Sequence, residues 1–284
     1  MNICIIIPAY NEDIHIAQTL QSLVEQTLLP KKIIVVNDNS TDETQAIIDS
    51  FSEKYSFIEG IINVSETSHQ PGSKVINAFQ RGFEGLSEAY DVICKFDADL
   101  IFPKTYLERI SSMFKSNERC GMAGGHCYIE KKKEWVLESL TNKDHIRGAL
   151  KAYRKECFDQ IGGLKNEMGW DTVDELLAQF HGWEIHTDNH LKVKHLKPTG
   201  KAYSKKAKWK QGEAFYKMRY GTLLTHIASA KLAIKKSSFR YYMNCIKGFY
   251  KSKRKKEPFM VSEEEGRFIR NLRWKNIKNK VIRT

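Results

Sequence analysis

The chain has 284 residues and a mass of 32.9 kDa, which suits one large domain or one domain with an appendage better than two equal domains. Its 46 lysines and arginines exceed its 34 aspartates and glutamates, so the formal net charge is +12 and the favoured partners are phosphates, nucleic acid or an anionic membrane face. The six cysteines form no CxxC pair, Pro8 interrupts the first apolar run, and no stretch approaches the ~20 apolar residues of a membrane span. We therefore predict a cytoplasmic protein with reduced thiols that lies on a membrane if it meets one.

Short β-branched apolar runs alternate with longer amphipathic segments along the first hundred residues. Helical spacing of apolar residues appears within residues 16–23 and 47–51, and Ser40 and Glu43 form an S-x-x-E capping box that predicts the start of the second helix. This alternation of strand-like and helix-like segments predicts a parallel sheet with crossover helices, in which ligands bind beyond the carboxyl ends of the strands. The predicted strands are residues 2–10, 31–38, 58–65 and 91–97.

The composition changes after Pro198. Residues 201–256 are crowded with lysine and arginine interleaved with aromatic residues. Apolar residues recur there at helical spacing, at Leu223, Ile227, Ala230 and Ile234. The pattern is typical of a basic amphipathic helix at an anionic membrane surface, and equally of a helix packed on the main domain with a solvated basic face. Both interpretations stay open. Ser262 and Glu265 form a second capping box, which predicts one more helix.

Two acidic turns follow predicted strands. Asp97 and Asp99 end the run "VICKF", and residues two apart in an extended segment point to the same side, so their carboxylates can converge on Mg²⁺ or Mn²⁺. Asp38 ends the run "IIVV", where a carboxylate can accept hydrogen bonds from a base or ribose. Either group can instead be an ordinary solvated turn.

Four motifs occur in a fixed order: "IIIPAYNE", "VVNDNSTDET", a G-x-K segment in "QPGSKVINAFQRG", and "KFDADL". In this order and spacing the chain resembles the family 2 glycosyltransferases with the GT-A fold, over roughly residues 1–200, and "GALKAYRKECFDQIGGL" extends the resemblance. The resemblance implies an α/β, Rossmann-like, mostly parallel sheet flanked by helices. It implies a nucleotide-sugar-binding and catalytic domain at 1–200, followed by a basic amphipathic helical region at 201–284.

The resemblance also implies roles for individual residues. Asp38 would bind the base or ribose of the donor, Asp97 would contact the ribose or sugar, and Asp99 would hold the metal. One departure is Asn37, which stands where the family often has an acid. The remaining implied donor contacts, lining the nucleotide pocket or lying near the base and diphosphate, are Pro8, Ala9, Tyr10, Glu12, Gly72 and Lys74.

The resemblance places the general base in "MGWDTVDELLAQFHGW". When the segment is aligned without a gap on the family's Gly-aromatic pair, here Gly182–Trp183, Asp171 takes the position of the base. Asp174 is the alternative base, and it reaches that position only if the alignment is shifted. Both acids can instead simply suit a helix amino terminus. His195, in "VKHLKP", matches a histidine that completes the metal site or touches the diphosphate in similar enzymes, or it is a structural histidine.

These inferences predict an inverting, metal-dependent glycosyltransferase. It would move a sugar from a nucleotide-diphosphate donor, UDP-linked by default, to a hydroxyl of a glycan or lipid-linked acceptor, in cell-surface polysaccharide synthesis. We expect it in the cytoplasm or on the inner leaflet, with an anionic membrane surface as a further partner. The alternatives are a nucleotidyltransferase and a basic nucleic-acid-binding protein. The second is disfavoured because acids in the sheet region would repel a polyanion, so we expect no nucleic-acid partner.

Overall fold

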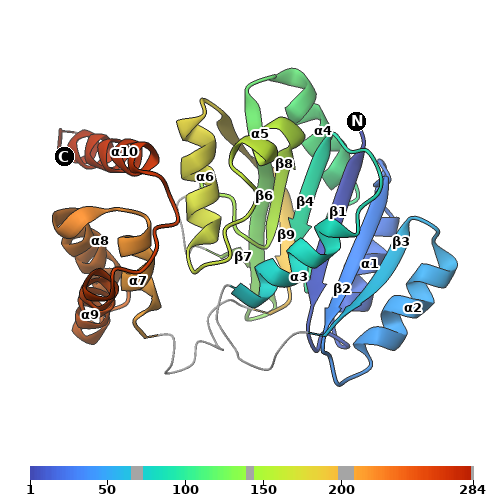
Figure 1. Ribbon diagram of the computed structural model, residues 1–284. Helices are drawn as coiled ribbons and strands as arrows, with labels where there is room; N and C mark the ends of the chain where they lie inside the picture. The colour runs from blue at the N-terminus through green and yellow to red at the C-terminus, as the bar shows by residue number, and fades with distance from the viewer. Residues whose placement is uncertain (65–72, 139–143, 198–207, 283–284) are drawn as a thin grey trace. The chain divides into compact units, whose positions relative to one another are not determined.

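The computed structural model describes residues 1–64, 73–138, 144–197 and 208–282. Within these residues the strands form one nine-stranded sheet flanked by helices (Figure 1), in the order β3-β2-β1-β4-β8-β6-β9-β5, with β7 paired to β6. No helix among the described residues combines the length and the apolar character that a bilayer span requires.

The four predicted strands of the first hundred residues are confirmed as parallel neighbours. Nearly every side chain of β1, β2 and β4 is buried, which explains why these strands read as continuous apolar runs rather than as alternating patterns. The elements of this half are β1 (Ile3–Ala9), α1 (Ile16–Val24), β2 (Lys32–Asp38), α2 (Thr44–Lys54), β3 (Ile58–Asn63), α3 (Ser73–Glu84) and β4 (Val92–Phe96).

The second half of the sheet is mixed. β8 runs antiparallel to β4 and to β6, and β9 is parallel to β6 and antiparallel to β5. These pairings bring the carboxyl end of β9 next to the segment that follows β4. The elements are β5 (Leu100–Ile101), α4 (Tyr106–Ser116), β6 (Cys120–Lys131), β7 (Glu134–Leu137), β8 (Leu150–Arg154), α5 (Lys155–Gln160) and β9 (Glu184–His195).

The helix α3 packs unusually close to the sheet. A Cβ atom at Gly82 would lie 2.7 Å from Cγ2 of Val36 and 2.8 Å from Cγ2 of Ile6, distances that real side chains do not adopt. Only glycine permits this approach. The close packing anchors α3, whose first turn carries Lys74.

The two expected capping boxes have different outcomes. The one at Ser262 is confirmed, because its Oγ accepts from Glu265 N at 3.2 Å while a Glu265 carboxylate oxygen accepts from Ser262 N at 2.6 Å. The one at Ser40 is wrong. α2 begins only at Thr44, and the Ser40 hydroxyl instead accepts a hydrogen bond from the backbone of Asn11, in the loop after β1.

The chain divides into two compact units. The first comprises the sheet and its helices, in residues 1–64, 74–138, 144–164 and 181–197; the second is helical, in residues 165–180 and 208–282, together with residue 73. The domain boundary expected at residue 200 stays a prediction, and the segment 165–180 belongs to the second unit. The helices of that unit are α6 (Trp170–Phe180), α7 (Lys210–Lys217), α8 (Gly221–Lys235), α9 (Phe239–Lys255) and α10 (Glu263–Ile282).

Candidate active site

The carboxyl ends of three adjacent parallel strands meet at one edge of the sheet. The registers pair Ala9 of β1 with Asn37 of β2, and Ile6 of β1 with Lys95 of β4. The segments that follow these strands therefore emerge side by side. They carry most of the polar residues that the sequence analysis selected, and this is the edge where open α/β sheets bind their ligands.

Hydrogen bonds tie the loop after β1 to the loop after β2. Asn11 adopts a left-handed conformation (φ 52°), its backbone N–H donates to Ser40 Oγ at 2.9 Å, and its Oδ1 accepts from Thr41 N at 2.9 Å. The backbone N–H of Glu12 donates to Thr44 Oγ1 at 2.8 Å. The exposed ring of Tyr10 is thus held on a fixed loop.

Asp38 is buried at the end of β2. Its Oδ1 accepts from Asn63 Nδ2, its partner on β3, at 2.8 Å. The adjacent Asn37 donates from Nδ2 to Gln45 Oε1 at 2.7 Å and accepts from Ser40 N at 3.0 Å. Asn37, which stands where the family often has an acid, thus uses both its amide nitrogen and its amide oxygen in hydrogen bonds.

Lys74 reaches back to the same edge of the sheet. Its Nζ lies 6.0 Å from the ring centroid of Tyr10, so the two residues border one space. Pro8 and Ala9 form the end of β1 beneath them. Gly72, expected in the same pocket, lies outside the described residues.

The acidic triplet after β4 is a turn rather than an extended segment, because β4 ends at Phe96 and β5 begins at Leu100. Asp97 forms an ion pair with the buried Lys95 and is held through its backbone N–H, which donates to Ala149 O at 2.8 Å. Asp99 is buried and turns toward His195. The two carboxylates therefore engage different partners.

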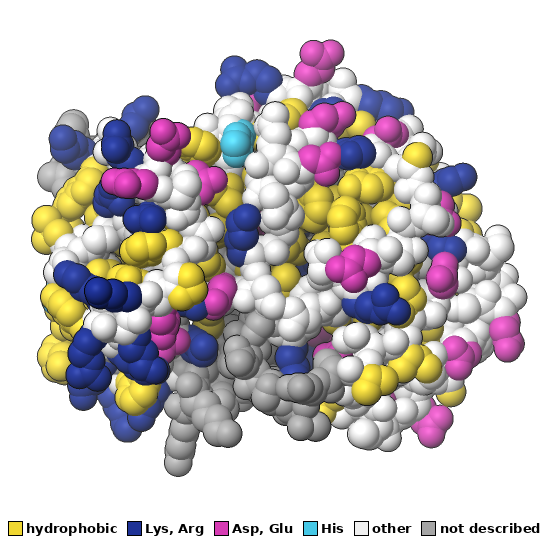
Figure 2. All heavy atoms as spheres, viewed as in Figure 1, with side chains coloured by type: hydrophobic (Ala, Val, Ile, Leu, Met, Phe, Trp, Pro, Cys, Tyr) yellow, Lys and Arg dark blue, Asp and Glu magenta, His cyan; other side chains and the backbone are white. Residues whose placement is uncertain are grey.

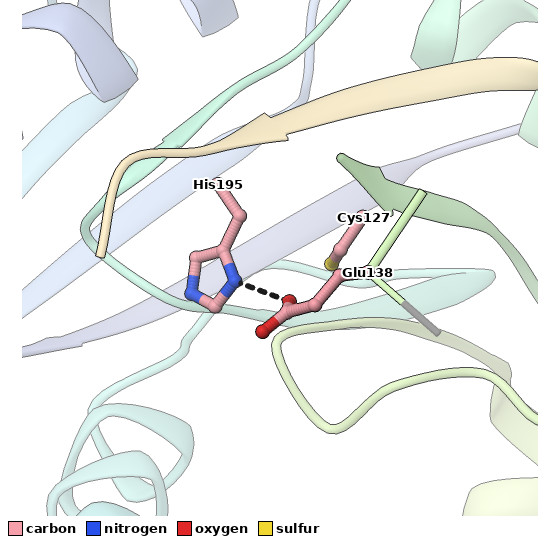
Figure 3. A group of neighbouring side chains, drawn as sticks. All are labelled: Cys127, Glu138 and His195. Atoms are coloured by element: carbon pink, nitrogen blue, oxygen red, sulfur yellow. Dashed lines mark hydrogen bonds and ion pairs between the residues drawn. The ribbon is translucent and has the colours of Figure 1, made fainter. Parts of the chain in front are cut away.

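His195 lies between two buried carboxylates. Its Nδ1 is 2.8 Å from Glu138 Oε2 (Figure 3), and its Nε2 is 3.5 Å from Asp99 Oδ2. Burial lowers the pKa of this imidazole, but the hydrogen bonds and negative charges of Asp99 and Glu138 outweigh burial and raise the pKa to about 9. The ring is therefore a cation at neutral pH, held by two anions.

Sequence reasoning missed Glu138. It follows β7, its backbone N–H donates to Cys127 O at 2.9 Å, and its Oε2 lies 2.9 Å from Arg147 Nη1. A single acid after "EWVL" gives no local signal. The pairing of β6 with both β7 and β9 brings it to His195, 57 positions further along the chain.

Cys127, Glu138 and His195 lie close enough together to hold a metal ion (Figure 3). Two observations argue against that position. Arg147 already places a cation on the Glu138 carboxylate, and burial raises the pKa of the Cys127 thiol far above its usual range, which opposes the thiolate that a metal needs. The opposite side of His195, which faces Asp99, is better suited.

Within the described part of the chain, two buried carboxylate oxygens of the segments that follow β1 and β4 accept no hydrogen bond, Glu12 Oε2 and Asp99 Oδ1. Burial raises the pKa of Glu12 to about 7; Lys197, whose Nζ lies 2.8 Å from Oε1, lowers it in part, and the charges of Asp99 and Asp97 raise it further. Three acids from two strand ends thus act on one another. An unsatisfied carboxylate oxygen of Asp99, beside the His195 imidazole, fits Mg²⁺ or Mn²⁺.

The two candidate bases lie in the first turns of α6, in the second unit. Asp174 is only 2% exposed, and its Oδ1 accepts from Glu175 N at 2.6 Å. Asp171 is partly exposed. Of the two, Asp171 has the more accessible carboxylate.

Solved structures with the same architecture define the class of this fold. A mannosyltransferase from Pyrobaculum calidifontis in complex with GDP-Man and Mn²⁺ is similar over 94% of this chain and 78% of that chain, with a TM-score of 0.58 at 17% identity. Residues 1–349 of S. aureus TarS in complex with UDP-GlcNAc are similar over 88% of this chain and 72% of that chain, with a TM-score of 0.57 at 15% identity. The expected GT-A fold is confirmed.

The family follows from the sequence match. The model of glycosyl transferase family 2 matches residues 4–165, more than half of the chain, and this protein belongs to that family. A probable glycosyltransferase, YdaM of Bacillus subtilis (strain 168), is 33% identical over 148 residues, which cover 51% of this chain and 34% of that protein. A poly-beta-1,6-N-acetyl-D-glucosamine synthase of Staphylococcus epidermidis is 26% identical over 199 residues, which cover 65% and 45%. The matched segments span less than half of these two relatives.

Proposed function

We propose that the protein is an inverting, metal-dependent glycosyltransferase. It passes a sugar from a nucleotide-diphosphate donor to a hydroxyl of a glycan or glycolipid acceptor in cell-surface polysaccharide synthesis. The observation that carries the proposal is the buried, unsatisfied Asp99 Oδ1 beside His195, on the strand edge that also presents Asp38 and Glu12.

The donor nucleotide would bind across the ends of β1 and β2. Asp38 accepts hydrogen bonds from the base or ribose, and the loop Pro8–Glu12, with the Tyr10 ring, lines the pocket. Lys74, which borders this space, neutralises charge on the diphosphate, and Gly72 of the same G-x-K segment lies near the base and diphosphate. Asp97 contacts the ribose or the sugar. We take UDP as the default nucleotide.

Asp99 and His195 would hold Mg²⁺ or Mn²⁺, which supplies charge neutralisation for the departing nucleoside diphosphate. For this role His195 must release its proton, because a metal binds the neutral imidazole. Glu138, fixed by Arg147, accepts from Nδ1–H and keeps Nε2 turned toward Asp99.

Asp171 would act as the general base. As the acceptor oxygen attacks the anomeric carbon from the face opposite the leaving group, its proton passes to the Asp171 carboxylate. One carbon–oxygen bond to the acceptor forms while the bond to the diphosphate breaks, so a single displacement inverts the anomeric centre. The burial of Asp174 and its hydrogen bond to Glu175 N favour a structural role for that residue.

A lipid-linked acceptor would bring the reaction to a membrane. We therefore propose that the protein works in the cytoplasm, peripherally on the inner leaflet, where the acceptor lipid anchors its growing glycan.

Thermal-shift measurements with UDP, GDP, dTDP and CDP, each with and without Mn²⁺, test the proposal. A donor fragment at about a hundred times its Kd stabilises the fold by about 2.7 kcal/mol, so the matching nucleotide should raise the midpoint clearly, and only with metal. Asp99→Asn should abolish this rise. Asp49→Asn, a carboxylate on α2 that accepts from Gln45, is the matched control and should retain it. A nucleotide response that survives Asp99→Asn, or none in any combination, would refute the proposed site.

A further inference from the structure

The positive charge of the chain is concentrated in one helical hairpin. Residues 221–256, which contain α8 and α9, hold ten lysines and arginines and no aspartate or glutamate, a formal charge of +10 against +12 for the whole chain. The helices pack against each other and are joined by Lys236–Ser238 alone. His226 Nδ1 and Tyr242 Oη, 2.7 Å apart, link them.

The same hairpin carries exposed apolar side chains. Among the described residues, six of the twelve large hydrophobic side chains that are exposed lie in α8 and α9. Ile234 is 79% exposed and Phe239 is 75% exposed. Spacings of four and seven place the three members from each helix on one face of that helix. We call this set the hairpin face: Leu223, Ile227 and Ile234 of α8, and Phe239, Met243 and Tyr250 of α9.

α8 and α9 do not pack against the rest of the unit through the hairpin face. Different residues of the hairpin are buried: Leu224, Thr225, Ser229 and Ala233 on α8, and Cys245, Gly248, Phe249 and Ser252 on α9. Glycines let α7 and α9 approach closely, since a Cβ at Gly248 would lie 2.1 Å from Trp209 O. The folded unit therefore obtains its core without the hairpin face.

Basic residues share the hairpin face. Lys231 lies four residues after Ile227, Lys247 lies four after Met243, and Arg254 lies four after Tyr250, so each follows an apolar member on the same helix face. Figure 2 shows hydrophobic and basic side chains interspersed over the region of the picture that α8 and α9 occupy in Figure 1. A surface of this composition suits the boundary between anionic headgroups and acyl chains.

We propose that the hairpin face docks the protein on an anionic lipid surface. Apolar members insert between headgroups while the lysines and arginines contact lipid phosphates, and long basic side chains extend along the interface. The proposal deepens the proposed function, on which it rests for the lipid-linked acceptor, by assigning the surface that meets the membrane.

Two other occupants fit less well. A nucleic acid would use the basic residues, but the aliphatic Leu223, Ile227 and Ile234 offer bases no stacking platform. A second copy of the chain, meeting face to face, would bring together two segments that each carry a formal charge of +10. Lipid satisfies both the apolar and the basic members.

Sedimentation with vesicles tests the proposal on the full chain. Vesicles containing about a third phosphatidylglycerol should bind at least roughly tenfold more protein than pure phosphatidylcholine, and raising NaCl from about 0.1 M to about 0.5 M should weaken this binding. Ile234→Ser with Phe239→Ser should reduce it about tenfold or more while leaving the thermal midpoint unchanged. Leu29→Ser with Val64→Ser, two exposed apolar residues of the first unit, is the matched control and should bind as the parent chain does.

Several outcomes would overturn the proposal: equal binding to the two vesicles, an equal loss in both double variants, or tighter binding to a single-stranded RNA homopolymer than to anionic vesicles. Self-association on gel filtration that only Ile234→Ser with Phe239→Ser abolishes, without vesicle binding, would assign the face to a second copy. Because the vesicle assay contains neither nucleotide nor sugar, its failure would leave the thermal-shift test of the transferase unaffected.

Discussion

The two units of this protein handle charge in opposite ways. At the strand edge of the first unit, charged side chains are buried and compensated: Asp99 and Glu138 enclose His195, and Asp97 holds Lys95. In the hairpin of the second unit, the lysines and arginines are mostly exposed, and residues 221–256 contain no aspartate or glutamate. Buried, paired charge is specific in position and costly to disturb. Exposed charge of one sign acts over a surface and is screened by salt.

The sharpest test of this comparison concerns Asp171 and Asp174 of α6. Asp171→Asn should lower the rate of sugar transfer by roughly 10²–10⁴-fold, because it removes the proposed base, and should leave the unfolding midpoint and nucleotide binding unchanged. Transfer is measured with the donor that the thermal-shift screen selects. Asp174→Asn is the matched variant, and its main effect should be a lower midpoint, since Asp174 is buried. Loss of transfer in Asp174→Asn with full stability would reverse the assignment.

Glu138 provides the next largest effect, within the buried cluster itself. Glu138→Ala removes the acceptor of His195 Nδ1 and the carboxylate beside Arg147, so Mn²⁺ affinity, measured by calorimetry, should fall about 10–100-fold. Glu138→Gln keeps an acceptor oxygen and should recover much of the affinity. If both variants bind Mn²⁺ like the parent chain, Glu138 does not position the metal-facing imidazole.

The pH dependence of stability should show a smaller effect. The folded pKa of His195 is about 9, above its unfolded value of about 6.5, so the protonated ring stabilises the fold. This stabilisation is fully present below about pH 6.5 and is lost as pH rises through about 9. Glu12 changes the stability of the fold in the same direction, because its pKa of about 7 exceeds the ordinary carboxyl value. Its contribution to stability is lost as pH rises through about 7.

Urea midpoints between pH 6 and 9.5 measure this effect, with His195→Gln as the comparison. That variant should flatten the upper part of the profile. The Mn²⁺ affinity of the parent chain should rise over the same range, because the metal and the proton compete for the imidazole. A parent profile that rises with pH, or a variant with an unchanged profile, would contradict the raised pKa of His195.

Local patterns in the sequence predicted much of this molecule. Runs such as "CIII" and "IIVV" predicted strands buried on both faces, because β-branched residues favour strands and no position in these runs is polar. The carboxyl ends of parallel strands share one edge, so the sequence alone predicted that the acids at positions 38, 97 and 99 lie there. The capping box at Ser262 also followed from neighbouring residues alone.

Other features depend on contacts between distant segments, and only the tertiary structure decided them. The capping box predicted at Ser40 was wrong because the Ser40 hydroxyl accepts a hydrogen bond from Asn11, on another loop. Glu138 was missed because the pairing of β6, β7 and β9 brings it to His195, and no pattern in the sequence indicates a contact between such distant residues. The raised pKa values of His195 and Glu12 arise from burial among other charges. Sequence by itself determined which segments fold locally and where strand ends present acids, whereas long-range packing decided which charges meet, because burial and pairing are properties of the assembled core.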